Sequence, residues 1–120
     1  MPFDWKEYLE LAKQLVGRAG SGYSAEAAER SAVSRAYYAA FCLVRNYAEK
    51  NLAFRKTGSA QDHESLREHL KRQRRVRLAS RLNKLRKWRN DCDYDDEVTN
   101  LSHYVQNAIR IAEQVIQECL

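Results

Sequence analysis

Apolar side chains recur along this chain at intervals of three and four residues, the spacing of amphipathic helices. The spacing predicts four long helices, over about residues 4–16, 25–51, 76–91 and 98–118. The last of these has the cleanest apolar face. A short helix over about 62–72 has a weaker pattern, because only Leu66 and Leu70 are apolar at an i, i+4 spacing.

Signals at the helix ends support these boundaries. Asp4, with Glu7 three residues later, resembles a capping box, and Ser24 is a candidate N-cap for the second helix. Residues 52–61 contain Gly58 and Ser59 and are predicted to form a loop. The chain has only four glycines and one proline, so it has few other places to turn, which favours long helices over strands.

The predicted helix over 25–51 has two apolar stripes, about 100° apart around its axis. One stripe consists of Val33, Tyr37, Ala40, Phe41, Val44 and Ala48, and the other of Ala32, Ala36, Ala39, Leu43 and Tyr47. A surface helix needs one such stripe, so this helix must be covered on two sides. It is therefore either the central helix of the bundle or the seam of a homodimer. We favour dimerisation, because one small bundle does not readily cover so much apolar surface.

These elements predict a single all-α domain over residues 1–120, a bundle of four long helices and one short one. The N-terminal residues lack the basic and apolar regions of a signal peptide, and no apolar stretch approaches the roughly 20 residues of a membrane span. We therefore expect a cytoplasmic protein that does not contact a membrane.

The formal net charge of +5 is unevenly distributed along the chain, which bears on the function. Residues 67–89 hold eleven of the 21 Lys and Arg side chains and a single acid, Glu68. Such a positive field attracts polyanions, of which RNA and DNA are the commonest in cells. The residues predicted to bind RNA are Lys71, Arg72, Arg74, Arg75, Arg77 and Arg86. The alternative is that the run 71–77 forms only a solvated face.

Arg89 continues the apolar row of Leu78, Leu82 and Leu85 on the predicted fourth helix. A guanidinium cannot lose its proton, so burying it without a partner is prohibitive. Two interpretations remain open. The side chain either forms an ion pair, with Asp93 one turn later or with another helix, or it faces a cleft that an anion can enter. Arg86 flanks the same side.

Other polar residues have structural interpretations. His63, His69 and His103 are expected at the surface or in packing, Tyr94 as an anchor of the turn after the fourth helix, and Arg35 in a bridge to an acid from another helix. Cys42 and Cys119 suit the core, and Cys92 is expected to be incidental. The three cysteines form no C-x-x-C pair, and no phosphate loop or hydrolase motif is present, so no metal or cofactor is expected.

Two segments resemble the HEPN superfamily (higher eukaryotes and prokaryotes nucleotide-binding). They are Arg30-Ser-Ala-Val-Ser-Arg-Ala-Tyr-Tyr-Ala-Ala-Phe41 and Leu85-Arg-Lys-Trp-Arg-Asn-Asp-Cys-Asp-Tyr-Asp95. The resemblance implies an up-and-down helical bundle that dimerises and brings two arginine motifs into one cleft. It also implies a toxin of a toxin–antitoxin pair, a minimal nucleotidyltransferase as antitoxin, and metal-independent cleavage of RNA.

The family's catalytic motif is an Arg followed, after four to six residues, by a His. Arg89 and Asn90 match its start, and Asp93 and Tyr94 would lie in the same cleft, but the His is absent. His63, His69 or His103 would have to replace it from another helix or from the partner subunit. The resemblance also makes Tyr94 the candidate for modification with AMP. The alternative is an inactive HEPN module that binds a nucleotide or a nucleotidyltransferase.

Overall fold

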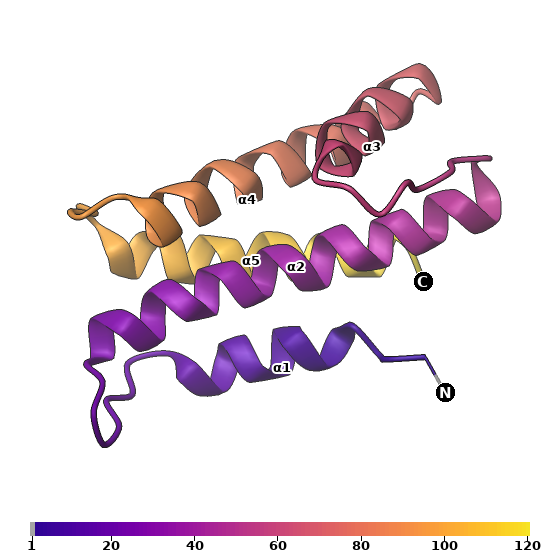
Figure 1. Cartoon of the computed structure of the whole chain (residues 1–120). Helices are drawn as coiled ribbons and strands as arrows, with labels where there is room; N and C mark the ends of the chain where they lie inside the picture. Colours follow the sequence, from indigo (N-terminus) through magenta and orange to yellow (C-terminus); the bar gives the residue numbers. More distant parts are fainter. Residues whose placement is uncertain (1) are drawn as a thin grey trace.

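The computed structural model describes residues 2–120 and contains five helices (Figure 1). They are α1 (Lys6–Leu15), α2 (Ala25–Asn51), α3 (Gln61–Arg72), α4 (Val76–Tyr94) and α5 (Leu101–Glu118). No strand forms within residues 2–120; an isolated bridge joins Gly20 and Tyr23 in the α1–α2 loop. The predicted all-α class, with four long helices and one short one, is confirmed.

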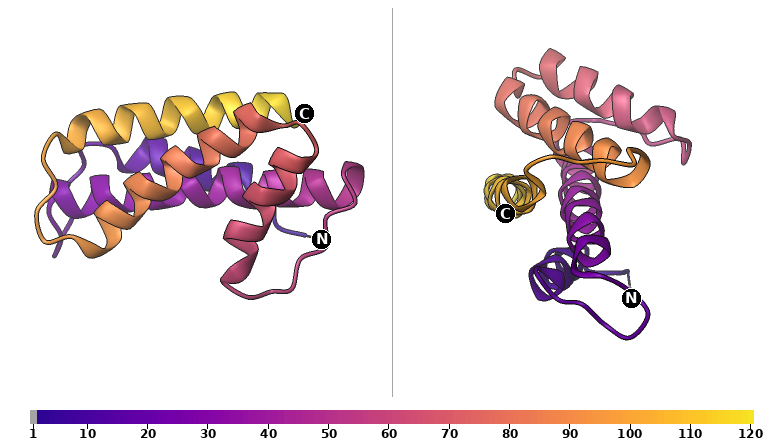
Figure 2. Two further views of the ribbon diagram at one scale, coloured as in Figure 1. Left: turned by 90° about the horizontal axis from the view of Figure 1, so that it is seen from above. Right: turned by 90° about the vertical axis from the view of Figure 1, so that its left-hand side faces the viewer.

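Helix α2 is the centre of the bundle. It packs against α1, α5 and α4, and over fewer residues against α3. The four long helices alternate in direction, while α3 lies across them near the C-terminal half of α2 (Figures 1 and 2). Both apolar stripes of α2 are covered within one subunit, with only Leu43 and Tyr47 half-buried. The central-helix interpretation is therefore sufficient, and the apolar surface of α2 gives no argument for a dimer.

The core follows the predicted periodicity. Leu78, Leu82 and Leu85 of α4 are at most 4 % exposed, and Tyr37 of α2, in the same core cluster, is 1 % exposed. Cys42 is buried as expected, but Cys92, expected to be incidental, is also buried, and burial raises the pKa of its thiol to about 11. Within residues 2–120, no helix is long and apolar enough to cross a bilayer.

Helix α4 is longer than the sequence pattern predicts. It continues three residues past Asp91 to Tyr94, so Asp93 belongs to the helix and not to an acidic turn. The reason is a tertiary contact from α2. The guanidinium of Arg30 donates to the carbonyls of Cys92 (3.0 Å), Asp95 (2.6 Å) and Asp96 (3.1 Å). A cation at the C-terminal carbonyls of a helix offsets the dipole there and satisfies acceptors that lack helical partners.

The N-terminal signals are partly confirmed. Ser24 Oγ accepts from the Ala27 amide at 3.1 Å, as expected of the N-cap of α2. Asp4 Oδ1 accepts from the Lys6 amide at 3.1 Å. The N-cap of α1 is Trp5, however, and no side chain caps it, so the capping box expected from Asp4 and Glu7 does not form within residues 2–120.

Candidate functional site

Arg89 lies on the face of α4 that is turned toward α2, with its side chain 17 % exposed. Its Nε donates to Asp93 Oδ2 at 3.0 Å and its Nη1 to Asn90 Oδ1 at 2.9 Å. Of the two interpretations left open, the ion pair with Asp93 is therefore the one that the structure shows. Nη2 makes no hydrogen bond within residues 2–120, where every fully buried polar side-chain atom has a partner. Nη2 is therefore not fully buried, and the ion pair leaves this nitrogen free of a protein partner.

Tyrosine rings surround this guanidinium. Arg89 Cζ lies 5.3 Å from the ring centre of Tyr38 and 5.8 Å from those of Tyr37 and Tyr94. Contacts of a cation with aromatic faces at this distance are attractive and leave the positive charge in place. Tyr37 and Tyr38 belong to the segment that resembles the HEPN superfamily, and the two segments of that resemblance are thus in contact.

Arg35 is also directed toward these tyrosines, although we expected it to bridge to an acid. Its Cζ lies 4.6 Å from the ring centre of Tyr8 on α1 and 5.3 Å from that of Tyr38. Within the described residues it has no carboxylate within 4 Å, and its Nη2 donates to Ser34 Oγ at 3.4 Å. The expected bridge is wrong because α1 presents an aromatic ring, and not a carboxylate, to this part of α2.

Two more arginines complete the cluster. Arg67 on α3 donates from Nη1 to the carbonyl of His63 at 3.0 Å, and Arg86 on α4 binds Asn83 Oδ1. The charges of Arg67, Arg89 and Arg86 all act on the hydroxyl of Tyr37, where they oppose the burial that raises its pKa. Burial and then the charge of Arg86 lower the pKa of Arg67. These groups therefore share one electrostatic environment.

We call Arg35, Arg67, Arg86 and Arg89 the arginine cluster. In the part of the chain that the structure describes, Asp93 is the one carboxylate within 4 Å of any of these four guanidiniums. Asp93 also lies 3.5 Å from the hydroxyl of Ser34. Four fixed positive charges with one ion-paired acid leave a net positive site in which a phosphate group would be attracted.

His63, at the N-terminal end of α3, lies beside the cluster. Its ring stacks on Phe41, with centroids 4.0 Å apart and planes 5° from parallel, and its Nδ1 is hydrogen-bonded to the hydroxyl of Tyr37. Burial, followed by the charges of Arg89 and Arg67, lowers the pKa of the imidazole. The prediction of a packing role is confirmed, but the location next to Arg89 was not visible in the sequence.

The other two histidines lie apart from the cluster. His69 binds the carbonyl of Leu52 through Nε2 at 2.6 Å and packs against Phe54, as expected of a structural residue. His103 is exposed in the first turn of α5. Neither can serve Arg89 within one subunit.

His63 lines an open cleft of about 520 Å³ between α1, α2 and the loop before α3. Its walls include Tyr8, Arg35, Tyr38, Arg45 and the backbone at 58–60. Asp62 holds this loop, because its carboxylate accepts from the Thr57 hydroxyl at 2.7 Å and from the Gly58 amide at 2.9 Å. These bonds lower the pKa of Asp62. The cleft is thus formed by ordered side chains of both signs, with the arginines in excess.

Tyr94 differs from expectation. It is the last residue of α4 and its side chain is 73 % exposed, so it anchors no turn. Its ring contacts only the guanidinium of Arg89 among the aromatic and cationic contacts of residues 2–120. The predicted catalytic residues Arg89, Asn90, Asp93 and Tyr94 therefore do lie together, as expected for neighbours on one helix.

The predicted RNA-binding residues divide into two groups. Arg86 belongs to the arginine cluster, whereas Lys71, Arg72, Arg74, Arg75 and Arg77 are all exposed around the turn between α3 and α4. At a rise of 1.5 Å per residue, Arg77 and Arg89, twelve positions apart, are separated by about 18 Å along α4. The basic run is therefore a separate surface, not a wall of the site around Arg89.

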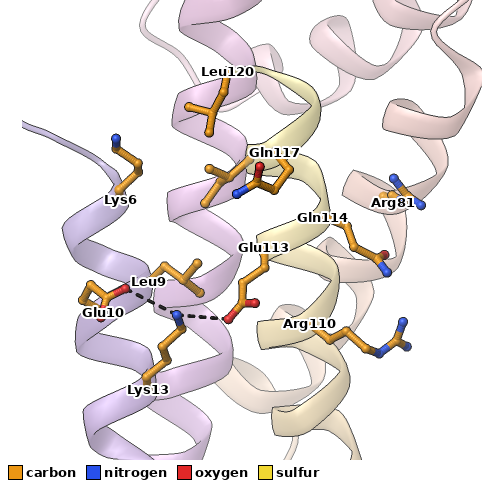
Figure 3. Close-up of a pocket in the computed structure, with 11 residues that line it drawn as sticks. Lys6, Leu9, Glu10, Lys13, Arg81, Arg110, Glu113, Gln114, Gln117 and Leu120 are labelled. Atoms are coloured by element: carbon orange, nitrogen blue, oxygen red, sulfur yellow. Dashed lines mark hydrogen bonds and ion pairs between the residues drawn. The ribbon is translucent and has the colours of Figure 1, made fainter.

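A second cleft, of about 730 Å³, lies between α1, α4 and α5 (Figure 3). At its centre Lys13 pairs with Glu113 at 3.0 Å and with Glu10 at 3.4 Å, and these bonds raise the pKa of Lys13. Arg81 also lines this cleft and pairs with Glu118. Each carboxylate of the lining is thus already paired with Lys13, and the surplus of cations is smaller than in the arginine cluster.

The sequence reasoning missed Tyr37, Tyr38 and Arg67 as parts of the site. In the sequence the Tyr-Tyr pair is part of a motif without an evident role, and Arg67 is one member of the basic run. Within residues 2–120, no group of three His, Cys, Asp or Glu side chains is arranged to hold a metal ion. No protein-family model, curated protein or solved structure matches this chain.

Proposed function

We propose that this protein binds RNA at the arginine cluster and cleaves it without a metal ion, as a toxin-like member of the HEPN superfamily. The observation that carries the proposal is the convergence of four guanidiniums from three helices beside an imidazole, with one ion-paired carboxylate among them. Such an excess of fixed positive charge suits a polyanion.

Arg89 is the residue to which we assign the scissile phosphate. Its free Nη2 can donate to a phosphate oxygen while Asp93 and Asn90 hold the rest of the guanidinium in position. A positioned cation stabilises the negative charge that develops on the phosphorus oxygens in the transition state. Arginine also presents a planar pair of donors that matches phosphate geometry, which a lysine at this position would lack.

The proposed dimer and the proposed partner protein follow from the resemblance to the HEPN superfamily. The two segments of the resemblance pack against each other through Arg30 and Cys92, and through Arg89 and the tyrosine pair, which supports the assignment. We accordingly propose a cytoplasmic homodimer with a minimal nucleotidyltransferase as antitoxin. Because α2 is covered within the subunit, the dimer must use another face. Sedimentation at micromolar concentration tests this, and a monomer would contradict it.

Incubation of bulk RNA or tRNA with the protein in EDTA tests the cleavage. We expect fragments from the wild type and a loss of about 100-fold or more in rate for Arg89→Ala, the effect of removing one electrostatic donor from a transition state. Arg18→Ala is the matched control, because Arg18 is exposed and its side chain has no partner among residues 2–120. Equal rates for wild type and Arg89→Ala would refute the role of Arg89.

The Asp93 ion pair favours a second candidate, an inactive module that binds a nucleotide or a nucleotidyltransferase. Asp93 offsets part of the charge of Arg89, and an anionic carboxylate beside the phosphate opposes its approach. The same gel distinguishes the two functions. Intact RNA after long incubation, with RNA still bound in a filter assay, supports the inactive module and rules out the nuclease.

A further inference from the structure

We propose that His63 is the general base of the cleavage reaction and replaces, from α3 of the same subunit, the histidine that is missing after Arg89. This inference rests on the proposed ribonuclease function and names the group that removes the proton from the 2′-hydroxyl. It concerns a residue on a different helix from Arg89, 26 positions earlier in the chain.

His63 and Arg89 face the same pair of tyrosines. The imidazole centre lies 5.6 Å from the ring centre of Tyr37 and 6.1 Å from that of Tyr38. Arg89 Cζ lies 5.8 Å and 5.3 Å from the same two centres. A phosphodiester that contacts both groups would therefore lie across this tyrosine pair. Neither His69 nor His103 meets this condition.

The imidazole is held in one orientation. Phe41 stacks on its face, and the Tyr37 hydroxyl bonds its Nδ1, so Tyr37 acts as a positioning residue. The base role requires that Nδ1 carries the proton and donates it to the Tyr37 hydroxyl, because Nε2 then keeps the lone pair that accepts a proton. Nε2 makes no hydrogen bond within residues 2–120, and since no fully buried polar side-chain atom there lacks a partner, Nε2 is not fully buried.

The surrounding charges keep this imidazole neutral. The groups that act on it come from all three helices around it: Tyr37 and Arg45 from α2, Asp62 and Arg67 from α3, and Arg89 from α4. Burial, Arg89, Arg67 and Arg45 lower the pKa of His63, while Asp62 acts in the opposite direction. A histidine that is neutral near pH 7 is ready to accept a proton, which is the state that a general base needs.

The reaction needs no further co-reactant. Nε2 of His63 takes the proton from the 2′-hydroxyl, and O2′ forms a bond to phosphorus as the bond from phosphorus to O5′ breaks. The products are a 2′,3′-cyclic phosphate and a fragment with a 5′-hydroxyl, which receives its proton from solvent or from the imidazolium. Arg89 stabilises the phosphorane-like charge throughout.

The test compares His63→Asn with the same change at His103, which is exposed and outside the cluster. Asparagine places its amide near the position of Nδ1, so it can still donate to Tyr37, but it has no group at Nε2. We expect His63→Asn to lower the cleavage rate by about 100-fold or more. Its Kd for a 2′-deoxy oligonucleotide of the same sequence, which cannot be cleaved, should stay within threefold of the wild type. His103→Asn should cleave like the wild type.

A second measurement does not depend on activity. In ¹⁵N NMR, wild-type His63 should carry its proton on Nδ1 at neutral pH; a proton on Nε2 would overturn the base assignment. Cleavage by His63→Asn within fivefold of the wild type, with Arg89→Ala inactive, would also overturn it while the ribonuclease stands. A wild type that cleaves no RNA overturns the ribonuclease itself, and the base role with it.

Discussion

The charged and polar side chains of the site are fixed by different kinds of contact. Arg89 is fixed by Asp93 and Asn90, Arg35 rests on the rings of Tyr8 and Tyr38, and His63 is enclosed by Phe41 and Tyr37. Burial and the charges of Arg89 and Arg67 lower the pKa of His63, so protonation of this imidazole is disfavoured in the folded state. These contacts therefore make the stability of the fold depend on pH.

We predict that the free energy of unfolding falls as the pH is lowered through about 6.5, the pKa of an unperturbed histidine. The pKa of His63 is lower in the folded state, so below that pH the unfolded chain binds more protons than the native one. This contribution to stability is fully present above the unfolded pKa and is lost as the pH falls toward the folded one. Urea unfolding at several pH values measures it.

His63→Asn provides the control for that prediction, because asparagine does not titrate. The variant should lose the part of the pH dependence that lies just below 6.5 and keep the part that comes from carboxylates at lower pH. An unchanged profile would show that His63 is not desolvated as the structure indicates.

At the scale of elements, the ends of the helices depend on contacts of different kinds. The C-terminus of α4 is held by Arg30 from α2, a contact between residues more than 60 positions apart. The turn between α3 and α4 is local, and there Arg74 adopts a left-handed conformation with φ 62°. That region favours glycine, since a Cβ is crowded by the backbone in it. Asn100 before α5 has φ 58°, which asparagine tolerates better.

We expect Arg74→Gly to raise the free energy of unfolding by about 1 kcal/mol, because it removes the unfavourable left-handed conformation. Arg74→Ala is the matched control, since it removes the same exposed guanidinium but keeps the Cβ. Its stability should stay within about 0.5 kcal/mol of the wild type. If the two variants have equal midpoints in thermal unfolding, the backbone at this turn is not strained.

At the scale of the whole molecule, positive charge occupies two regions at different points along α4. The arginine cluster lies toward its C-terminal end, and the exposed basic run surrounds its N-terminus. An RNA chain that reaches from one region to the other would contact both, with the run contributing binding energy but no chemistry. If the run is only a solvated face, removal of its charges should leave the salt dependence of RNA binding unchanged.

Three exposed residues of the run, Arg72, Arg75 and Arg77, test this when all are changed to Gln. For single-stranded RNA the slope of log Kobs against log salt should become shallower by about 0.7 for each phosphate that is no longer neutralised, or about 2 in total. The matched control changes the exposed Arg18, Lys50 and Arg55 to Gln and removes the same charge elsewhere. Equal slopes for the two variants between roughly 50 and 200 mM salt would show that the run only interacts with solvent.

The pattern of the sequence predicted the elements well, because helix periodicity and capping depend on neighbours within a few residues. It predicted α2 from Ala25 to Asn51, and it identified Arg89 by its place on a leucine row. It was wrong where a distant residue decides the outcome. Arg30 extends α4 past Asp91, and Tyr8 takes the place of an acid beside Arg35. Helices α1, α4 and α5 cover the apolar surface of α2, so that surface no longer argues for the dimer, which stays a prediction.

The all-α class, the helices and the group of Arg89, Asn90 and Asp93 could be predicted from the amino-acid sequence, since they follow from the spacing of residues along single helices. The position of His63, Arg67 and the tyrosine pair beside Arg89 depends on the tertiary fold. The rotation of one helix against another is set by packing over the whole core, and no local pattern encodes it. For that reason the sequence could identify Arg89, whereas the position of the His63 imidazole near it became visible only in the fold.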